Sequence, residues 1–200
     1  MKQRRKQPEV TRQAIMAAAG EEFSQHGYAG SRLGAIVARA GLTKGGLFHH
    51  FPDKRALAKA WMEECLAPGI EELWVLPLAE TDSLAGLKRV CRARIETLEA
   101  TDATSTLAAL ATELGKEDAE LAAILAAIFA GWRAAVSGVF ERGRTAGGIF
   151  PAVKPAAEAS LLVALVIGIA VQNLAPQDGS VRQVCLTSLE DYLDTLRSGA

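Results

Sequence analysis

The chain has 200 residues, with little cysteine, few aromatic residues and a net charge of only −1. Its three cysteines, Cys65, Cys91 and Cys185, are odd in number, far apart and without metal-ligand spacing, which indicates reduced thiols in a cytoplasm. Aromatic residues make up 6% while Ala, Leu, Glu and Arg are plentiful, a balance that favours helices over strands. Because half of the residues are hydrophobic, the chain can bury a substantial core, and we predict an all-α fold.

A signal peptide and a membrane span are also missing from the pattern. The N-terminus MKQRRKQPEV is basic, but no apolar segment follows it. The longest apolar run, ASLLVALVIGIAV at 159–171, is too short to cross a bilayer. We therefore expect a cytoplasmic protein with no membrane partner.

Constellations typical of catalysis or of metal binding are scarce as well. No nucleophile stands near a base and an orienting acid, so we expect no enzymatic activity. His49 and His50 diverge if they lie on a helix, and no third ligand has a useful spacing. The KGG sequence at 44–46 lacks the P-loop pattern and a preceding strand. The expectation is no metal and no cofactor.

Charge is distributed unevenly along the chain. Residues 1–55 hold ten Lys and Arg against four Asp and Glu, a charge of +6. Residues 56–200 hold twelve basic and nineteen acidic side chains, a charge of −7. A basic first quarter on an acidic remainder indicates an N-terminal module, residues 1–55, that meets a polyanion.

Short helices are predicted in this basic module. Residues 1–10 are interpreted as a flexible arm, with Pro8 keeping the chain extended, and the first helix is expected to stop at Gly27. The predicted N-caps of successive helices are Thr11, Ser31, Thr43 and Asp53. The second and third helices are joined by a tight turn at Gly41, which makes a helix-turn-helix pattern. The fourth helix is expected to run to Pro68, and the structure of 68–82 is left open.

Residues 82–200 contain further helical patterns, among them a long central helix after Asp118. Residues 156–174 are apolar on nearly every face, and the last helix, near 180–197, is amphipathic. We infer that these two helices pack against their copies in a homodimer, with Gly168 permitting close approach. The alternative is that 156–174 forms the central helix of a monomeric bundle.

Three motifs within residues 11–61 carry a family resemblance. They are F-x-x-x-G-Y ending at Tyr28, I-x-x-x-A-G-L-T at 36–43 and K-G-x-L-F-x-H-F-x-x-K at 44–54. This ordered set resembles the DNA-binding domain of the tetracycline-repressor (TetR) family of bacterial regulators. The resemblance implies about nine helices, a homodimer built on the last two helices, and a ligand-binding and dimerisation domain at 56–200. Its partners would be a double-stranded DNA operator and a small-molecule inducer.

The third helix suits the major groove because its first residues lack bulk and offer N–H groups at the positive end of the helix dipole. Gly45 and Gly46 let the backbone approach phosphate or base edges. Many relatives have tyrosine where this chain has Phe48, so a hydroxyl that contacts phosphate is missing. The resemblance implies DNA-contact roles for Arg4, Arg5, Arg12, Ser31, Arg32, Thr43, Lys44, Gly45, Gly46, Phe48, His49, His50 and Lys54. A solvated face is the alternative for the two lysines.

Wide or polar residues interrupt the apolar stripes of the second domain, where the resemblance implies a ligand pocket. The candidates are Trp61, Cys65, Trp74, Cys91, Arg94, Ile95, Phe129, Trp132 and Asn173. Core packing is the alternative for each residue taken singly.

We predict a repressor that binds a palindromic operator and is released when a ligand tilts the fourth helix. Two recognition helices about 34–36 Å apart fit consecutive major grooves of DNA, and a change in this spacing would release the operator. One alternative is a thiol- or electrophile-sensing regulator that uses Cys65 or Cys91. Another is a helical ligand-binding protein without a transcriptional role, and an enzyme with a DNA-binding appendage is the least favoured.

Overall fold

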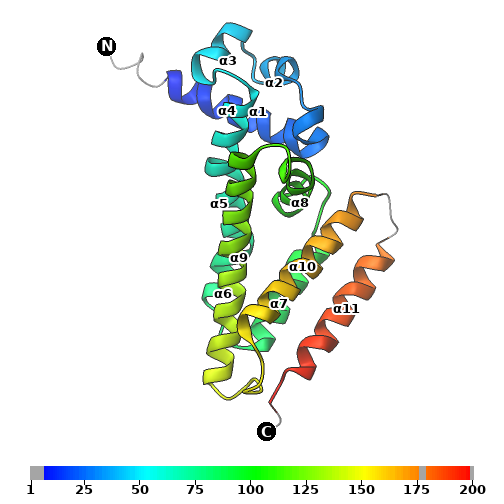
Figure 1. The fold of residues 1–200 in the computed structure, drawn as a ribbon. Helices are drawn as coiled ribbons and strands as arrows, with labels where there is room; N and C mark the ends of the chain where they lie inside the picture. The colour runs from blue at the N-terminus through cyan, green and yellow to red at the C-terminus, as the bar shows by residue number, and fades with distance from the viewer. Residues whose placement is uncertain (1–6, 176–178, 199–200) are drawn as a thin grey trace.

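The computed structural model describes residues 7–175 and 179–198, and in these ranges the regular structure is helical apart from an isolated bridge between Ile149 and Arg197. Counting the uninterrupted helical segment 54–79 once, these ranges hold nine helices, as predicted. The α-helices are α1 (Gln7–Gly30), α2 (Leu33–Arg39), α3 (Lys44–His50), α4 (Lys54–Trp61), α5 (Ala67–Ile70), α6 (Leu76–Ala79), α7 (Leu84–Glu96), α8 (Ala103–Leu114), α9 (Ala119–Thr145), α10 (Pro155–Asn173) and α11 (Ser180–Thr195). Figure 1 shows α1–α4 gathered at one end and the longer helices extending away from them.

The start of α1 corrects the prediction of a flexible arm for residues 7–10, which are helical, while residues 1–6 lie outside the described residues. Pro8 is compatible with this start, since a first-turn residue needs no N–H for an intrahelical bond. Gly27 interrupts the helix as expected, with φ 67 and ψ −176, although one more helical turn follows to Gly30.

Two of the four predicted N-caps, Thr43 and Asp53, are confirmed, whereas Thr11 lies inside α1 and is not a cap. The Thr43 side chain accepts a hydrogen bond from Gly46 N at 3.2 Å, and Asp53 accepts one from Ala56 N at 2.7 Å. The cap assigned to Ser31 is wrong, because Arg32 holds the N-cap position of α2 without a side-chain bond. Instead, the Ser31 hydroxyl donates to Tyr28 O at 2.7 Å.

The fourth predicted helix continues through the segment that was left open. Between its α-helical parts lie two π-helical turns, η1 (Met62–Leu66) and η2 (Glu71–Val75), each followed two residues later by a proline. Pro68 and Pro77 lack the N–H of a normal helical bond, and a wider turn relieves the clash of the ring with the preceding turn. The result is one long helical segment, 54–79, that joins the basic module to the rest of the molecule.

The remaining helices enclose a hydrophobic core. α9 and α8 pack against the 54–79 segment, α10 packs mainly on α9 and α8, and α11 packs mainly on α7 (Figure 1). Arg92 pairs with Glu190, and Lys88 Nζ lies 2.6 Å from Asp194, so charged pairs also fasten α7 to α11. The fold therefore places α3 at one end and the faces of α10 and α11 on a side.

Two helices are long and apolar enough to cross a membrane, namely α9 with 27 residues and α10 with 19. The α10 helix is longer than the run at 159–171, so length alone no longer excludes a span. Both helices pack on other helices of this chain, which is the arrangement of core helices.

Candidate DNA interface and ligand core

The α3 helix presents most of its side chains to solvent. Leu47 and Phe51 face inward and are buried, as the sequence predicted. Phe48 is 47% exposed although it is a large apolar residue. The exposed members of the predicted DNA-contact set on and before α3 are Thr43, Lys44, Gly45, Phe48 and His49, with Gly46 and His50 half-buried. The buried side chains of Leu47 and Phe51 thus attach α3 to the module, and its opposite face is exposed.

The two glycines of α3 are not required by the packing of this chain. A Cβ on Gly45 would meet its nearest neighbouring atom, Thr43 Oγ1, at 3.9 Å, and one on Gly46 would meet the same atom at 3.6 Å. Both are ordinary van der Waals distances, so alanine would fit. In a helix interior a glycine costs roughly 1 kcal/mol relative to alanine. Gly45 and Gly46 lie in the first turn of α3, and the described contacts include none within 3.4 Å that would require a missing side chain.

Lys54 behaves differently from the exposed residues of α3. Its Nζ donates to Ser31 O at 2.7 Å and to Ala29 O at 3.3 Å, and it lies 4.7 Å from the centre of the Tyr28 ring. Burial lowers the pKa of this lysine from its usual value. Lys54 therefore ties the start of α4 to the turn before α2.

Two other predicted contact residues are also engaged within the chain. Arg12 forms an ion pair with Glu64 and lies over the Phe51 ring at 5.4 Å. Hydrogen bonding to the Glu64 carboxylate raises the pKa of Arg12. Ser31 is 5% exposed, so its side chain does not share the surface on which Arg32 is exposed. Arg4 and Arg5 lie outside the described residues.

The sequence reasoning missed a buried carboxylate behind this surface. Glu22 is only 3% exposed. It accepts a hydrogen bond from Arg32 N at 3.1 Å, and its other oxygen lies 3.4 Å from an Arg39 guanidinium nitrogen. The only sequence signal for this buried carboxylate is the position of Glu22 on the inward face of the first helix, four residues before His26. The signal is weak because most glutamates are solvated.

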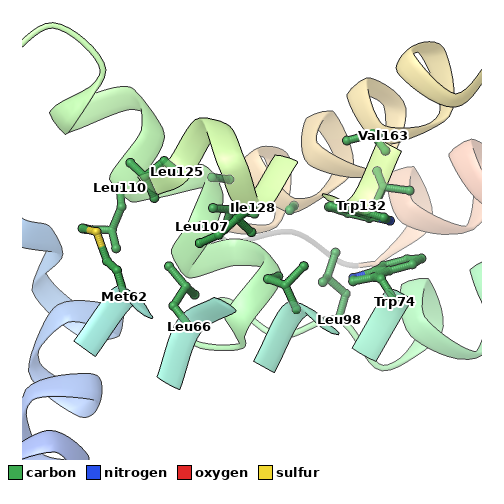
Figure 2. Close-up of a cluster of buried hydrophobic side chains, with 14 of the residues drawn as sticks. Met62, Leu66, Trp74, Leu98, Leu107, Leu110, Leu125, Ile128, Trp132 and Val163 are labelled. Atoms are coloured by element: carbon green, nitrogen blue, oxygen red, sulfur yellow. The ribbon is translucent and has the colours of Figure 1, made fainter. Parts of the chain in front are cut away.

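In the second domain, the Trp74 and Trp132 rings contact one another at one end of a buried cluster, with ring centroids 4.7 Å apart (Figure 2). Trp74 Nε1 donates to Thr104 Oγ1 at 3.0 Å. Trp132 Nε1 is buried and has no hydrogen-bond partner among the described residues. A buried N–H without an acceptor costs about 1–3 kcal/mol, so the Trp132 indole is an exception to the pairing usual for buried polar groups.

Aliphatic residues from several helices extend the cluster away from these rings. Figure 2 shows them on the 54–79 segment, α8, α9 and α10, with Leu98 from the segment between α7 and α8. None was singled out by the sequence reasoning, because each reads as ordinary core. They are Met62, Leu66, Leu98, Leu107, Leu110, Leu125, Ile128 and Val163.

Trp61 does not join this cluster; with Cys65 it lines a separate cavity of about 440 Å³ beside α1, so its role in ligand binding stays a prediction. Its ring packs beneath α1, where its centroid is 5.4 Å from the Phe23 ring. A Cβ on Gly20 would lie 2.8 Å from Trp61 Nε1, so the contact is close. The physical reason is that α4 turns this face toward α1 before the core begins. Cys65, one turn further along, is exposed outside the core.

The other ligand candidates occupy varied positions. Cys91 and Ile95 are buried on α7, and burial raises the pKa of the Cys91 thiol to about 12. Burial also raises the pKa of Cys65. A raised pKa leaves little thiolate at neutral pH, which opposes the thiol-sensing alternative.

Asn173 is also used within the chain. Its side-chain nitrogen donates to Leu98 O at 3.0 Å, and Arg182 donates to the same carbonyl at 2.9 Å. Phe129 is half-buried against the core, and Arg94 is half-buried on α7. The structure thus brings Trp74 and Trp132 together and distributes the remaining candidates around them.

Comparison with known proteins identifies the class. The family described as "Bacterial regulatory proteins, tetR family" matches residues 15–61, and the family "BetI-type transcriptional repressor, C-terminal" matches residues 84–198, more than half of the chain. The chain therefore belongs to the TetR family of transcriptional regulators, which are not enzymes.

Individual relatives agree with this assignment. The HTH-type transcriptional regulator RutR of Escherichia coli K12 is 35% identical over 89 residues, 42% of this chain and 40% of RutR. The repressor AcnR of Corynebacterium efficiens is 35% identical over 95 residues, 48% of this chain and 46% of AcnR. The match thus spans less than half the length of these curated relatives. A TetR regulator structure from Chloroflexus aurantiacus has the same fold, with a TM-score of 0.85, 24% identity and coverage of 97% of this chain and 100% of that one.

Proposed function

We propose that this protein is a cytoplasmic repressor that binds a palindromic DNA operator as a homodimer and is released by a small, mostly apolar inducer. The observation that carries the proposal is the exposure of Lys44, Phe48 and His49 on α3. The same helix has two glycines without side chains, at positions where the packing of this chain would accept alanine. Bare backbone and side-chain donors at the start of a helix suit the major groove, and the surrounding positive charge suits the phosphates.

The proposed dimer uses the outward faces of α10 and α11. The inward face of α10 is buried, whereas Leu161, Leu165 and Val184 are 43%, 40% and 65% exposed. These residues border a groove of about 430 Å³ between the two helices, which also includes Gly168. Apolar side chains gathered on a surface are typical of a protein interface, and a second copy offers the same apolar surface.

The proposed inducer site is the cluster around Trp74 and Trp132. Its aliphatic lining suits an apolar ligand, and the free Trp132 N–H suits a single acceptor on that ligand. Met62, Leu66 and Trp74 lie on the same helical segment as Lys54. A ligand that displaces these side chains would therefore shift the 54–79 segment and, with it, the spacing of the two α3 helices in the dimer.

Capture and sequencing of genomic DNA fragments by the purified protein tests the proposal. We expect enrichment of a palindrome whose half-sites lie about one helical turn, 34–36 Å, apart. The Gly46→Glu variant serves as the matched control, because a bulky anion on α3 should abolish the enrichment. Equal enrichment of all fragments, or none, would favour the helical ligand-binding protein without a transcriptional role.

A second experiment tests the inducer site. Apolar aromatic compounds that carry one hydrogen-bond acceptor should raise the melting temperature and release the captured DNA. The Trp132→Phe variant keeps an aromatic side chain, although a smaller one, and removes the N–H, so it should bind such compounds more weakly, by up to about tenfold. Equal binding by this variant would place the inducer elsewhere.

A further inference from the structure

A corner between α8 and α9 contacts the DNA-binding module at a point that the recognition motifs do not include. Glu113, in the last turn of α8, accepts hydrogen bonds through Oε2 from Tyr28 N at 2.7 Å and from Ala29 N at 3.0 Å. These two residues are separated from Glu113 by about 85 positions in sequence. The contact therefore joins the C-terminal domain directly to the end of α1.

The two amide groups need this acceptor because of Gly27. Its positive φ breaks α1, so the Tyr28 and Ala29 amides lie at the start of a new turn, where the first N–H groups of a helix lack an intrahelical acceptor. The Glu113 carboxylate supplies what an N-cap side chain would supply, from another helix. A Cβ at position 27 would lie 2.0 Å from Glu113 Oε1, so the glycine also makes room for the carboxylate.

The same corner holds the module at a second point. Arg55 Nε donates to Asp118 Oδ2 at 2.5 Å, and Arg55 also donates to Glu120 at 2.7 Å. Lys59 pairs with Glu120 as well. The Arg55–Asp118 pair is bidentate, and Asp118 also caps α9, so it holds α4 to the start of α9. Glu113 differs because it is half-buried and accepts its hydrogen bonds from the backbone of α1 itself.

The other end of the connection lies in the core. Thr104, in the first turn of α8, accepts the hydrogen bond of Trp74, and Leu107 and Leu110 on the same helix belong to the buried cluster (Figure 2). A displacement of α8 by a molecule in that cluster would carry Glu113 with it. This route does not require the 54–79 segment.

We infer that Glu113 is a positioning residue that sets the orientation of the helix-turn-helix module and thereby the spacing of the two recognition helices. The inference rests on the proposed function, since spacing matters only for a dimer on a palindrome. Glu113 touches no DNA. Its loss should therefore affect the choice among operators of different spacing more than it affects contact with each half-site.

The test compares operator binding by the wild-type protein and by Glu113→Ala, Glu113→Gln and Glu117→Ala. Glu117 is an exposed carboxylate on the same corner, so its variant removes the same charge near the DNA. Each protein is titrated with the captured palindrome and with a version whose half-sites are moved apart by one base pair. The measured quantity is the dissociation constant for the version with separated half-sites divided by the dissociation constant for the captured palindrome.

We expect Glu113→Ala to lower this ratio by about tenfold, as loss of hydrogen bonds to a charged acceptor would. Glu113→Gln, which keeps a neutral acceptor, should give an intermediate ratio, and Glu117→Ala should match the wild type. A wild-type ratio in Glu113→Ala, or an equal fall in Glu117→Ala, would overturn the inference.

Amide hydrogen exchange separates the inference from the proposed function. In Glu113→Ala the Tyr28 and Ala29 amides should exchange at least about tenfold faster, while Ile36 and Val37 in α2 keep their protection. If α2 also loses protection, Glu113→Gln carries the test in its place. Protein that binds no operator contradicts the proposed function, and unchanged exchange at Tyr28 and Ala29 contradicts the role of Glu113.

Discussion

The basic module and the C-terminal domain use their distinctive residues in opposite directions. In the module, Lys44, Phe48 and His49 are exposed on α3, where the His49 ring contacts only the neighbouring His50 ring among the described ring contacts. In the C-terminal domain, Trp74 and Trp132 point inward and stack on one another. The exposed residues of α3 come from one short sequence motif on a helix held in place by its neighbours. The buried tryptophan pair depends on several helices that meet only in the folded chain.

The largest expected effect, on operator affinity, comes from disrupting the proposed homodimer, because a single DNA-binding module would then bind only one half-site. Leu165→Glu places a charge on the exposed face of α10 and should give a monomer. Operator affinity should fall by at least about a hundredfold, since one half of the contacts is lost. Light scattering and DNA titration measure the two results. Leu76→Glu, a change at an exposed leucine outside that face, should leave both unchanged.

Two aromatic truncations compare the inward and outward sets directly. Trp132→Ala should destabilise the fold by about 3–5 kcal/mol, because it opens a cavity in the core. Phe48→Ala, on exposed α3, should cost less than about 0.5 kcal/mol and act on DNA binding instead. Chemical denaturation gives both values, and similar losses in the two variants would contradict the contrast.

Two lysines sharpen the comparison within the module. Lys54→Ala should lower stability by about 1 kcal/mol, because Ser31 O and Ala29 O lose a donor that is partly exposed. Lys44→Ala should leave stability unchanged and reduce the slope of log K against log salt by about one. Denaturation and DNA titrations at several salt concentrations measure these effects. Equal salt slopes for wild type and Lys44→Ala would remove Lys44 from the interface.

The smallest effects are expected at the cysteines. Cys65→Ser and Cys91→Ser should both retain DNA release by a non-electrophilic inducer, because the raised pKa of each thiol disfavours the reactive thiolate. Alkylation with iodoacetamide should modify exposed Cys65 before buried Cys91. Loss of release in either serine variant would restore the thiol-sensing alternative.

The parts of the structure that were predictable depend on neighbours in sequence. The caps at Thr43 and Asp53, the break at Gly27 and the long helix after Asp118 all follow from residues within one or two turns. The prediction of an extended arm was wrong for residues 7–10, because Pro8 was expected to keep the chain extended although proline is tolerated in the first turn of a helix. Prolines also left 68–82 open, since π-helical turns that accommodate them have no simple sequence period.

The contacts that were not predictable join residues far apart in the chain. Whether Lys54 faces DNA or Ser31, and whether Trp61 faces a ligand or Phe23, depends on how α1 and α4 pack. The carboxylate of Glu113 gave no signal at all, because its partners are backbone groups that carry no residue identity.

The sequence by itself determined the family, the helical composition and the position of the exposed helix α3. Local helix propensity, N-caps and one ordered motif are sufficient for these three features. Only the tertiary structure decided which carboxylates hold the module, which tryptophan keeps an unpaired N–H and which lysine is already engaged. The physical reason is that burial and hydrogen-bond partners are properties of packed surfaces. Residues such as Trp74 and Trp132, which are 58 positions apart, acquire a shared role only when their helices meet.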